Sequence, residues 1–296
     1  MAEIVTGFEE RGKGILGVVL GAVLFIYYNS MIMAETILSG SFDNVACVEC
    51  HEKQNNELVK AWQLSIHGKN ETKADCVACH GNSHKDAAVH ARQDETCIAC
   101  HEEKSPVVHS YATSKHGLIL RLEKKQWDWT QSLAGANYRT PVCAYCHLHA
   151  GEHNVSSGVR GADLLEKNEE KLKAVQDATR RVCQDCHAPR YVTRLFENGE
   201  RMLEIARMKV REARALLEQA REGYRTEELI MAESQYQKMQ LHLKNVYLGI
   251  AHQSPDYQWW HGHPALDGDL LRIKGVMSER RRVKKINSAH KAKPEK

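Results

Sequence analysis

Five places in this chain of 296 residues carry two cysteines separated by two residues, with a histidine directly after the second. The five copies account for all ten cysteines. They are Cys47-Val-Glu-Cys50-His51, Cys76-Val-Ala-Cys79-His80, Cys97-Ile-Ala-Cys100-His101, Cys143-Ala-Tyr-Cys146-His147 and Cys183-Gln-Asp-Cys186-His187. Thiols at this spacing reach the two vinyl groups of one haem, and the adjacent histidine then lies under the iron. The pattern predicts five covalently bound haem c groups, held by the ten cysteines, with His51, His80, His101, His147 and His187 as proximal ligands.

Zinc sites and disulfides also use closely spaced cysteines. A structural zinc site needs such cysteine pairs in twos, and it does not require a histidine after every second cysteine. Disulfides in a secreted protein do not require that histidine either. The repetition of the whole five-residue pattern, with no spare cysteine, therefore favours haem over both alternatives.

The composition agrees with a core built around haem. Only 42% of the residues are hydrophobic and 6% are aromatic, which predicts a thin conventional core for a chain of this length. The formal net charge of +3 does not include the haem propionates, so we expect the mature surface to be neutral to acidic.

The N-terminal residues predict export. An uncharged run begins at Gly14, directly after Arg11 and Lys13, and it continues to Ala34. A cleaved signal peptide with Ala34 at its cleavage site is one interpretation, and an uncleaved anchor is the other. We favour a single transmembrane signal-anchor over residues 14–38 in the cytoplasmic membrane, with residues 1–13 cytoplasmic because basic residues remain inside. The haem-binding part is then periplasmic or extracytoplasmic, and that compartment excludes nucleic acid as a partner.

The rest of the chain divides into three parts and predicts a mainly α fold. Residues 41–190 hold all five motifs and are expected to form a loop-rich haem-packing domain, with a short helix over 162–182. Residues 191–262 are rich in helix formers and predict a long antiparallel helical hairpin packed on the haem region. Its helices are expected at 195–221 and 227–252, broken at Gly223 and closed by Pro255.

Residues 263–296 are expected to form a basic C-terminal tail. The tail includes Arg280, Arg281, Arg282, Lys284 and Lys285. Such a segment is usually a solvated and mobile end of the chain. Its charge also suits docking of an acidic redox partner, so both interpretations stay open.

Histidines are numerous enough to fill both axial positions of all five irons. The chain has 17 histidines, of which five are the proximal candidates. Ligation by two histidines suits electron transfer because both axial positions are filled in both oxidation states.

Several stretches resemble the octahaem hydroxylamine oxidoreductases. They are Cys97–His101 followed by Tyr111–Gly117, then Thr140–His147, Arg181–His187 and Ala251–Gly262. The resemblance covers about residues 76–262. It implies a mostly helical C-terminal half, haems stacked in close contact, and a homo-oligomer, often a trimer.

The same resemblance suggests the distal iron ligands. By motif they are His67, His84, His116, His153 and His252. His84 departs from the family, where the spacing after the attachment motif is one residue shorter.

Other departures concern catalysis. The chain has five motifs instead of eight, and the second to fifth are similar to the last four of the family. The family's catalytic haem would then have to be the first one, at Cys47–His51, or be absent. No counterpart of the family's His-Asp acid/base pair is found, and Tyr257 is only a nominal candidate for its cross-linking tyrosine. Catalytic residues therefore stay unassigned.

Two functions are compatible with these features, and a third interpretation accompanies the first. The favoured one is an anchored pentahaem carrier that moves electrons between a quinol-linked or periplasmic donor and a redox partner. The alternative is an enzyme of the hydroxylamine oxidoreductase or nitrite reductase type, with one five-coordinate haem that acts on a small nitrogen compound. Pentahaem nitrite reductases share the haem count, but they are much longer, and their Cys-x-x-Cys-Lys motif does not occur here. The carrier could also be a subunit of a larger cytochrome complex.

Overall fold

The chain folds into a region of short helices followed by a bundle of long ones. The computed structural model describes residues 27–28, 39–69, 74–132, 137, 139–155 and 169–291. These residues are mainly helical, and among them β-structure is limited to one isolated bridge between Ser41 and Ser83. The anchor expected at 14–38 lies outside the described residues, apart from Tyr27 and Tyr28. In the part of the chain that is described, no helix is both long and apolar enough to cross a membrane.

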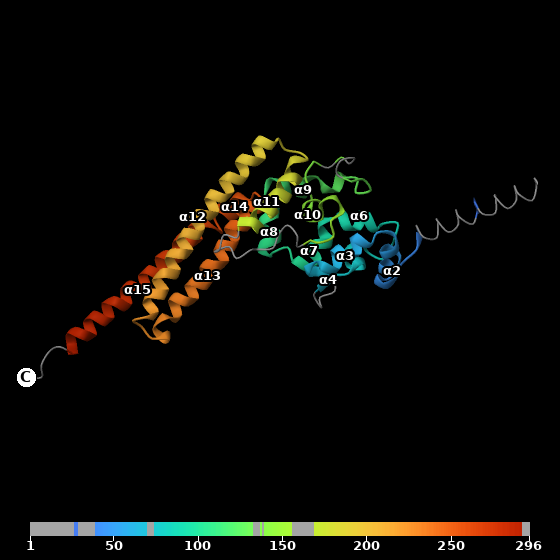
Figure 1. Ribbon diagram of the computed structural model, residues 1–296. Coiled ribbons are helices and arrows are strands. Elements are labelled where there is room, and N and C mark those ends of the chain that lie inside the picture. The colour runs from blue at the N-terminus through green and yellow to red at the C-terminus, as the bar shows by residue number, and fades with distance from the viewer. Residues whose placement is uncertain are drawn as a thin grey trace, which may run out of the picture.

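The attachment region, here residues 39–187, contains all five motifs. Figure 1 shows its helices gathered at one end of the molecule. They are α2 (Asn44–Gln54), α3 (Asn56–Leu64), α4 (Ile66–Lys69), α5 (Cys76–His80), α6 (Ala87–Arg92), α7 (Asp94–His101), α8 (Pro106–Ala112), α9 (Lys115–Glu123), η1 (Lys124–Gln126), α10 (Cys143–His147), η3 (His149–Gly151) and α11 (Glu169–Gln184). The helix expected at 162–182 corresponds to α11, and residues 162–168 lie outside the described ranges.

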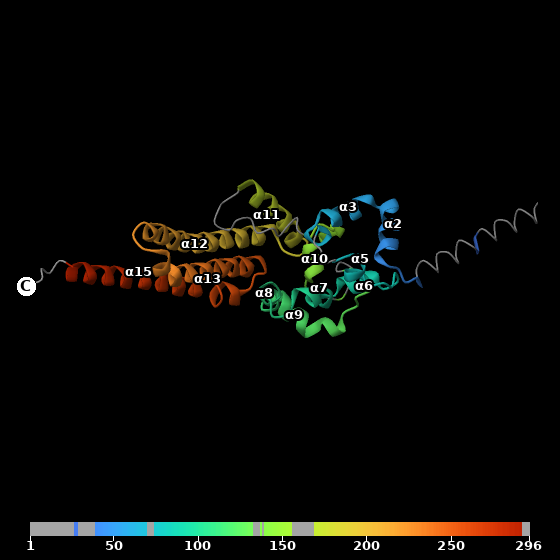
Figure 2. The same ribbon diagram turned by 90° about the horizontal axis from the view of Figure 1, so that it is seen from below.

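Three long helices form the bundle that extends away from the attachment region (Figures 1 and 2). They are α12 (Pro189–Arg221), α13 (Thr226–Ala251) and α15 (His263–Lys291), and the short α14 (Pro255–Trp259) joins the last two. Their facing sides bury one continuous apolar cluster. Its members are Leu203, Ala206, Val210, Ala213, Met239, Leu243, Val246, Leu266, Leu270 and Ile273.

The predicted hairpin is therefore two thirds of a three-helix bundle. Its two helices lie close to the expected bounds, since α12 ends at Arg221 and α13 begins at Thr226. The third helix, α15, occupies most of the segment expected to be a basic tail. Leu266, Leu270, Ile273 and Met277 recur at helical spacing along α15 and are all buried. The basic residues near its end are exposed, so the charge of the segment does not prevent its other face from packing.

A buried carboxylate links α13 to α15. Asp269 is 1% exposed. Its oxygens accept hydrogen bonds from Gln235 and His242 on α13, and from Arg272 one turn later on α15. A buried charge with several donors is satisfied, whereas the same charge without them would be costly. This network fixes how α15 lies against α13.

Candidate haem-binding sites

Each attachment motif begins at a defined helix position. Asp43 accepts a hydrogen bond from Ala46 N, and Asp75 accepts one from Ala78 N, so these aspartates cap the helices that carry the first two motifs. The third and fourth motifs lie on α7 and α10, and the fifth closes α11. None of the ten cysteines is paired in a disulfide. Helical geometry thus places both thiols and the histidine of each of the first four motifs on one local surface, whereas Cys186 and His187 of the fifth motif lie in the turn after α11.

The proximal candidates each face a second histidine. In every case the partner comes from the five residues that the sequence suggested as distal ligands. The pairs are His51 with His84, His67 with His101, His80 with His153, His116 with His187, and His147 with His252, with ring centroids 6.4, 6.1, 6.1, 6.1 and 6.4 Å apart, respectively.

These separations match two imidazoles on opposite sides of one metal ion. An imidazole nitrogen lies about 2 Å from a metal that it ligates, so two such rings have centroids roughly 6 Å apart. Rings that pack directly have centroids about 4.5–7 Å apart, so the distance by itself fits ring packing as well as a shared metal ion. What favours a shared iron is that each of the five proximal candidates has a histidine partner at the spacing expected for two axial ligands.

The attachment region also has little apolar core of its own. Among the described residues of this region, one compact cluster is found, and it contains Leu120, Trp127 and Val142. The helices α2, α5 and α10, which carry three of the motifs, contain no buried residue. A flat apolar macrocycle beside each motif would supply the missing contacts, so this region fits haem better than it fits a conventional core.

A repeated Ser-x-His-Gly turn positions His67 and His116. Ser65 and Ser114 are buried, and each accepts a hydrogen bond from the backbone N–H of the glycine three residues later. A Cβ on Gly68 would lie 2.3 Å from Trp62 O, and one on Gly117 would lie 2.2 Å from Tyr111 O. Only glycine fits this close approach, which fixes the backbone beside each histidine.

His252 comes from the bundle and lies deeper than the other distal candidates. It follows the last residue of α13, and its Nδ1 lies 2.7 Å from Ser110 Oγ on α8. Burial, with a smaller effect from His147, lowers the pKa of His252 to about 4. The ring is therefore neutral at pH 7, which is the form that binds a metal. Burial is also the main cause that lowers the pKa of His67, His80, His116 and His147.

Consecutive motifs are tied to one another by side-chain hydrogen bonds. Asn44 Oδ1 accepts from Cys76 N, which links the first motif to the second. His90, which contacts Cys79 O, lies beside Thr96, which precedes the third motif. Cys143 N of the fourth motif donates to Asp94 Oδ1 on the helix of the third at 2.9 Å, and Tyr145 Oη of the fourth donates to Asp185 Oδ2 of the fifth at 2.7 Å. The five motifs therefore follow one another in space in the order in which they occur in the chain.

Comparison with known proteins identifies the family. A family described as "Seven times multi-haem cytochrome CxxCH" matches residues 69–227, which is more than half of the chain. The chain belongs to this multihaem cytochrome family. Its attachment motifs are therefore haem c sites, as the cysteine pattern predicted.

One relative of the cytochrome carries the names of two enzymes. A probable nitrite reductase-hydroxylamine oxidoreductase fusion protein of Kuenenia stuttgartiensis is 23% identical over 86% of this chain. The chain matches only 44% of that relative's length. The predicted resemblance to the hydroxylamine oxidoreductases is thereby confirmed.

Two solved structures share the fold of the cytochrome. One is a chain of a reducing HAO-like protein complex of Kuenenia stuttgartiensis, with a TM-score of 0.53 and 17% identity over 83% of this chain and 87% of that one. The other is a hypothetical multiheme protein, with a TM-score of 0.58 and 17% identity over 73% of this chain and 61% of that one. At these identities the likeness concerns the fold alone.

Several residues that shape the sites were not predicted from the sequence. Asp94, Ser110 and Asp185 are examples, because each contacts a motif or histidine that lies far away in the chain. Asp185 occupies a variable position of the fifth motif and accepts hydrogen bonds from both Tyr145 and His149. The buried serines of the Ser-x-His-Gly turns did carry a signal, since the same four-residue pattern occurs twice.

Asp94 is expected to matter for stability because it is 2% exposed and accepts the Cys143 N–H. Asp94→Ala leaves that N–H without its acceptor, and we expect a loss of about 1–3 kcal/mol in the free energy of unfolding. Asp94→Asn retains an acceptor oxygen and should cost less. Thermal unfolding of the haem-loaded protein measures both effects, and equal stability of the wild type and Asp94→Ala would contradict this role.

Asp94 should also make the stability of the folded protein depend on pH. Burial raises the pKa of Asp94 above its ordinary value. The folded state therefore binds the proton more tightly than the unfolded state, and stability falls as the pH rises from the ordinary aspartate range through the raised pKa. The Asp94→Asn variant should lack this part of the pH dependence.

Proposed function

We propose that the protein is a pentahaem electron-transfer cytochrome whose irons are each ligated by two histidines. The observation that carries this proposal is the pairing of all five proximal histidines with a second histidine at 6.1–6.4 Å. An iron with both axial positions filled by protein has no site for a substrate, but it can exchange electrons with little rearrangement. The distal ligands in this proposal are His67, His84, His116, His153 and His252.

The arrangement of the motifs supports transfer along a chain of haems. Haem supplies the one-electron chemistry when it is bound. The protein's part is to hold neighbouring sites close together, and the hydrogen bonds between consecutive motifs do this. The crossed ligands add rigidity, because His67 lies between the first and second motifs but faces the third. A histidine that faces a motif other than its neighbours in the sequence joins two segments that are distant in the chain.

The alternative function is an enzyme acting on a small nitrogen compound. The name of the Kuenenia relative favours it, although this chain corresponds to less than half of that protein. Such an enzyme needs one iron with an open position. In that case one proximal candidate would not share its iron with the histidine that it faces, or the catalytic haem would come from another subunit.

Location and partners complete the proposal. The uncharged run after Lys13 supports a single-pass anchor over residues 14–38, with the haem-binding region on the periplasmic or extracytoplasmic side. A redox protein or a larger cytochrome complex is the proposed partner, and one solved structure of the same fold comes from a protein complex. A trimer remains a proposal from the family resemblance.

Low-temperature EPR of the oxidised holoprotein, together with carbon monoxide added to the reduced form, tests the ligation. We expect only low-spin signals and an unchanged visible spectrum, because no iron has an open axial position. A high-spin signal from about one haem in five with a matching carbon monoxide shift would contradict the carrier and support the enzyme.

A further inference from the structure

A cluster of metal-binding side chains lies apart from the five histidine pairs. His109, Asp256 and His261 each offer one ligand atom, and these atoms lie within 4.8 Å of one another. None of the three residues faces a proximal histidine in the pairs described above. His109 lies on α8 of the attachment region, Asp256 lies on the short α14, and His261 follows that helix.

The local fold of α14 brings Asp256 and His261 together. Ser254 caps this helix by accepting a hydrogen bond from Tyr257 N. After α14 the chain turns back, and both Trp260 N and His261 N donate to the carbonyl of Asp256. As a result, His261 Nε2 lies 3.5 Å from Asp256 Oδ2.

The third side chain, His109, is held beside them by contacts between α8 and the bundle. Ser110 Oγ lies 2.7 Å from His252 Nδ1, and Thr113 Oγ lies 2.8 Å from Ser254 Oγ. These two contacts fix α8 against the chain on both sides of Gln253. The His109 and His261 rings are consequently 6.2 Å apart and nearly perpendicular.

A buried tyrosine orients the two histidines. Tyr257 is 5% exposed, and its ring lies 5.7 Å from that of His109 and 5.0 Å from that of His261. Since this ring packs against both imidazoles, it restricts their rotation. The ligand atoms therefore need only small side-chain movements to converge on one ion.

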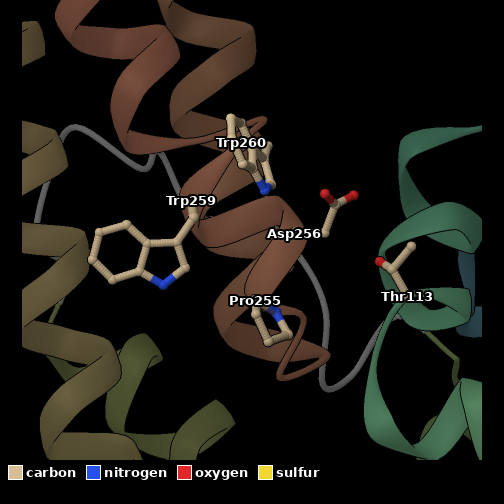
Figure 3. A pocket seen from close by; sticks show the side chains of 5 residues that line it. All are labelled: Thr113, Pro255, Asp256, Trp259 and Trp260. Atoms are coloured by element: carbon tan, nitrogen blue, oxygen red, sulfur yellow. The ribbon is translucent and has the colours of Figure 1, made fainter.

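Two imidazoles and one carboxylate suit a divalent transition metal ion better than calcium or magnesium, which prefer oxygen ligands. Three protein ligands also leave a coordination position for water or another small ligand. Asp256 lines a surface pocket of about 520 Å³ with Thr113, Pro255, Trp259 and Trp260. Figure 3 shows its carboxylate projecting from α14 toward the helix that carries Thr113.

We propose that His109, Asp256 and His261 form an open three-ligand site for a divalent cation of the zinc class. The ion joins α8 to α14, and thus the attachment region to the bundle. This site is separate from the haem irons and does not depend on whether the cytochrome is a carrier or an enzyme.

Isothermal titration of Zn²⁺ into the full-length, haem-loaded protein after treatment with EDTA tests the site. We expect one Zn²⁺ per chain, retained on desalting and counted by elemental analysis. His109→Ala, Asp256→Asn and His261→Ala should each weaken binding by more than about tenfold, since even loss of an outer-shell partner costs about 10–100-fold. His263→Ala, which removes a histidine two positions from His261, is the matched control and should bind as the wild type does.

Two outcomes would overturn the proposal. One is the absence of stoichiometric binding to the wild type, and the other is unchanged affinity in Asp256→Asn and His261→Ala. Haem absorption and circular dichroism identify any variant that fails to fold. In that event, anomalous diffraction at the zinc edge from wild-type crystals decides the question, because a peak away from these three residues refutes the site and a peak among them supports it.

Discussion

Replacement of His252 by alanine is expected to convert about one haem in five to a high-spin form that binds carbon monoxide. His252 faces His147 with ring centroids 6.4 Å apart, and it lies deep between α8 and the end of α13. Without the imidazole, the iron held by His147 loses its proposed distal ligand. Ser110 contacts His252 through a hydroxyl that ligates haem iron poorly, and the hydroxyl of Tyr111, whose ring lies 6.1 Å from that of His252, donates to Pro141 O.

EPR of the oxidised variant and the carbon monoxide difference spectrum measure this effect. Added imidazole should enter the vacated space and restore the low-spin signal. His290→Ala is the control because His290 is exposed near the end of α15, and it should leave every haem low-spin. If His252→Ala keeps five low-spin haems in the absence of imidazole, the proposed pairing with His147 is wrong.

Replacement of Leu243 by alanine is expected to lower the free energy of unfolding of the bundle by about 2–5 kcal/mol. Leu243 is 2% exposed and belongs to the apolar cluster shared by α12, α13 and α15. Its truncation removes buried apolar surface and leaves a cavity among three long helices that cannot easily close. Denaturant unfolding followed by far-ultraviolet circular dichroism measures the loss.

Leu241→Ala is a closely matched control on the same helix. Leu241 is 64% exposed, so the same chemical change should alter stability by only about 0.5 kcal/mol or less. Similar losses in both variants would mean that α13 does not present the Leu243 side to the bundle core.

Local sequence signals predicted the helices of the bundle well. The break at Gly223 and the run of helix formers on either side correspond to the observed α12 and α13, but α12 begins at Pro189, six residues before the expected start. The signal failed for α15, where a dense run of basic residues suggested a free tail. Its four buried apolar residues are spaced for a helix, but they stabilise one only because α12 and α13 supply a surface on which to pack.

In the candidate haem sites, too, some features follow from the local sequence and others only from the tertiary structure. The motifs alone predicted the cysteines and the proximal histidines, because that chemistry is contained in five consecutive residues. The five distal candidates were chosen by resemblance, and the structure places each of them opposite a proximal histidine. Which histidine faces which could not be predicted, since His67 is closest in sequence to the first and second motifs but faces His101.

The sequence by itself determined that this chain is a multihaem c-type cytochrome with a mainly helical fold, because covalent attachment and helix formation depend on residues that are near one another in the chain. Tertiary structure alone decided the histidine pairs, the order of the motifs in space, the third helix of the bundle and the cluster around Asp256. Each of these brings together residues from distant segments. Their contacts depend on how the helices pack, and no local pattern contains that information.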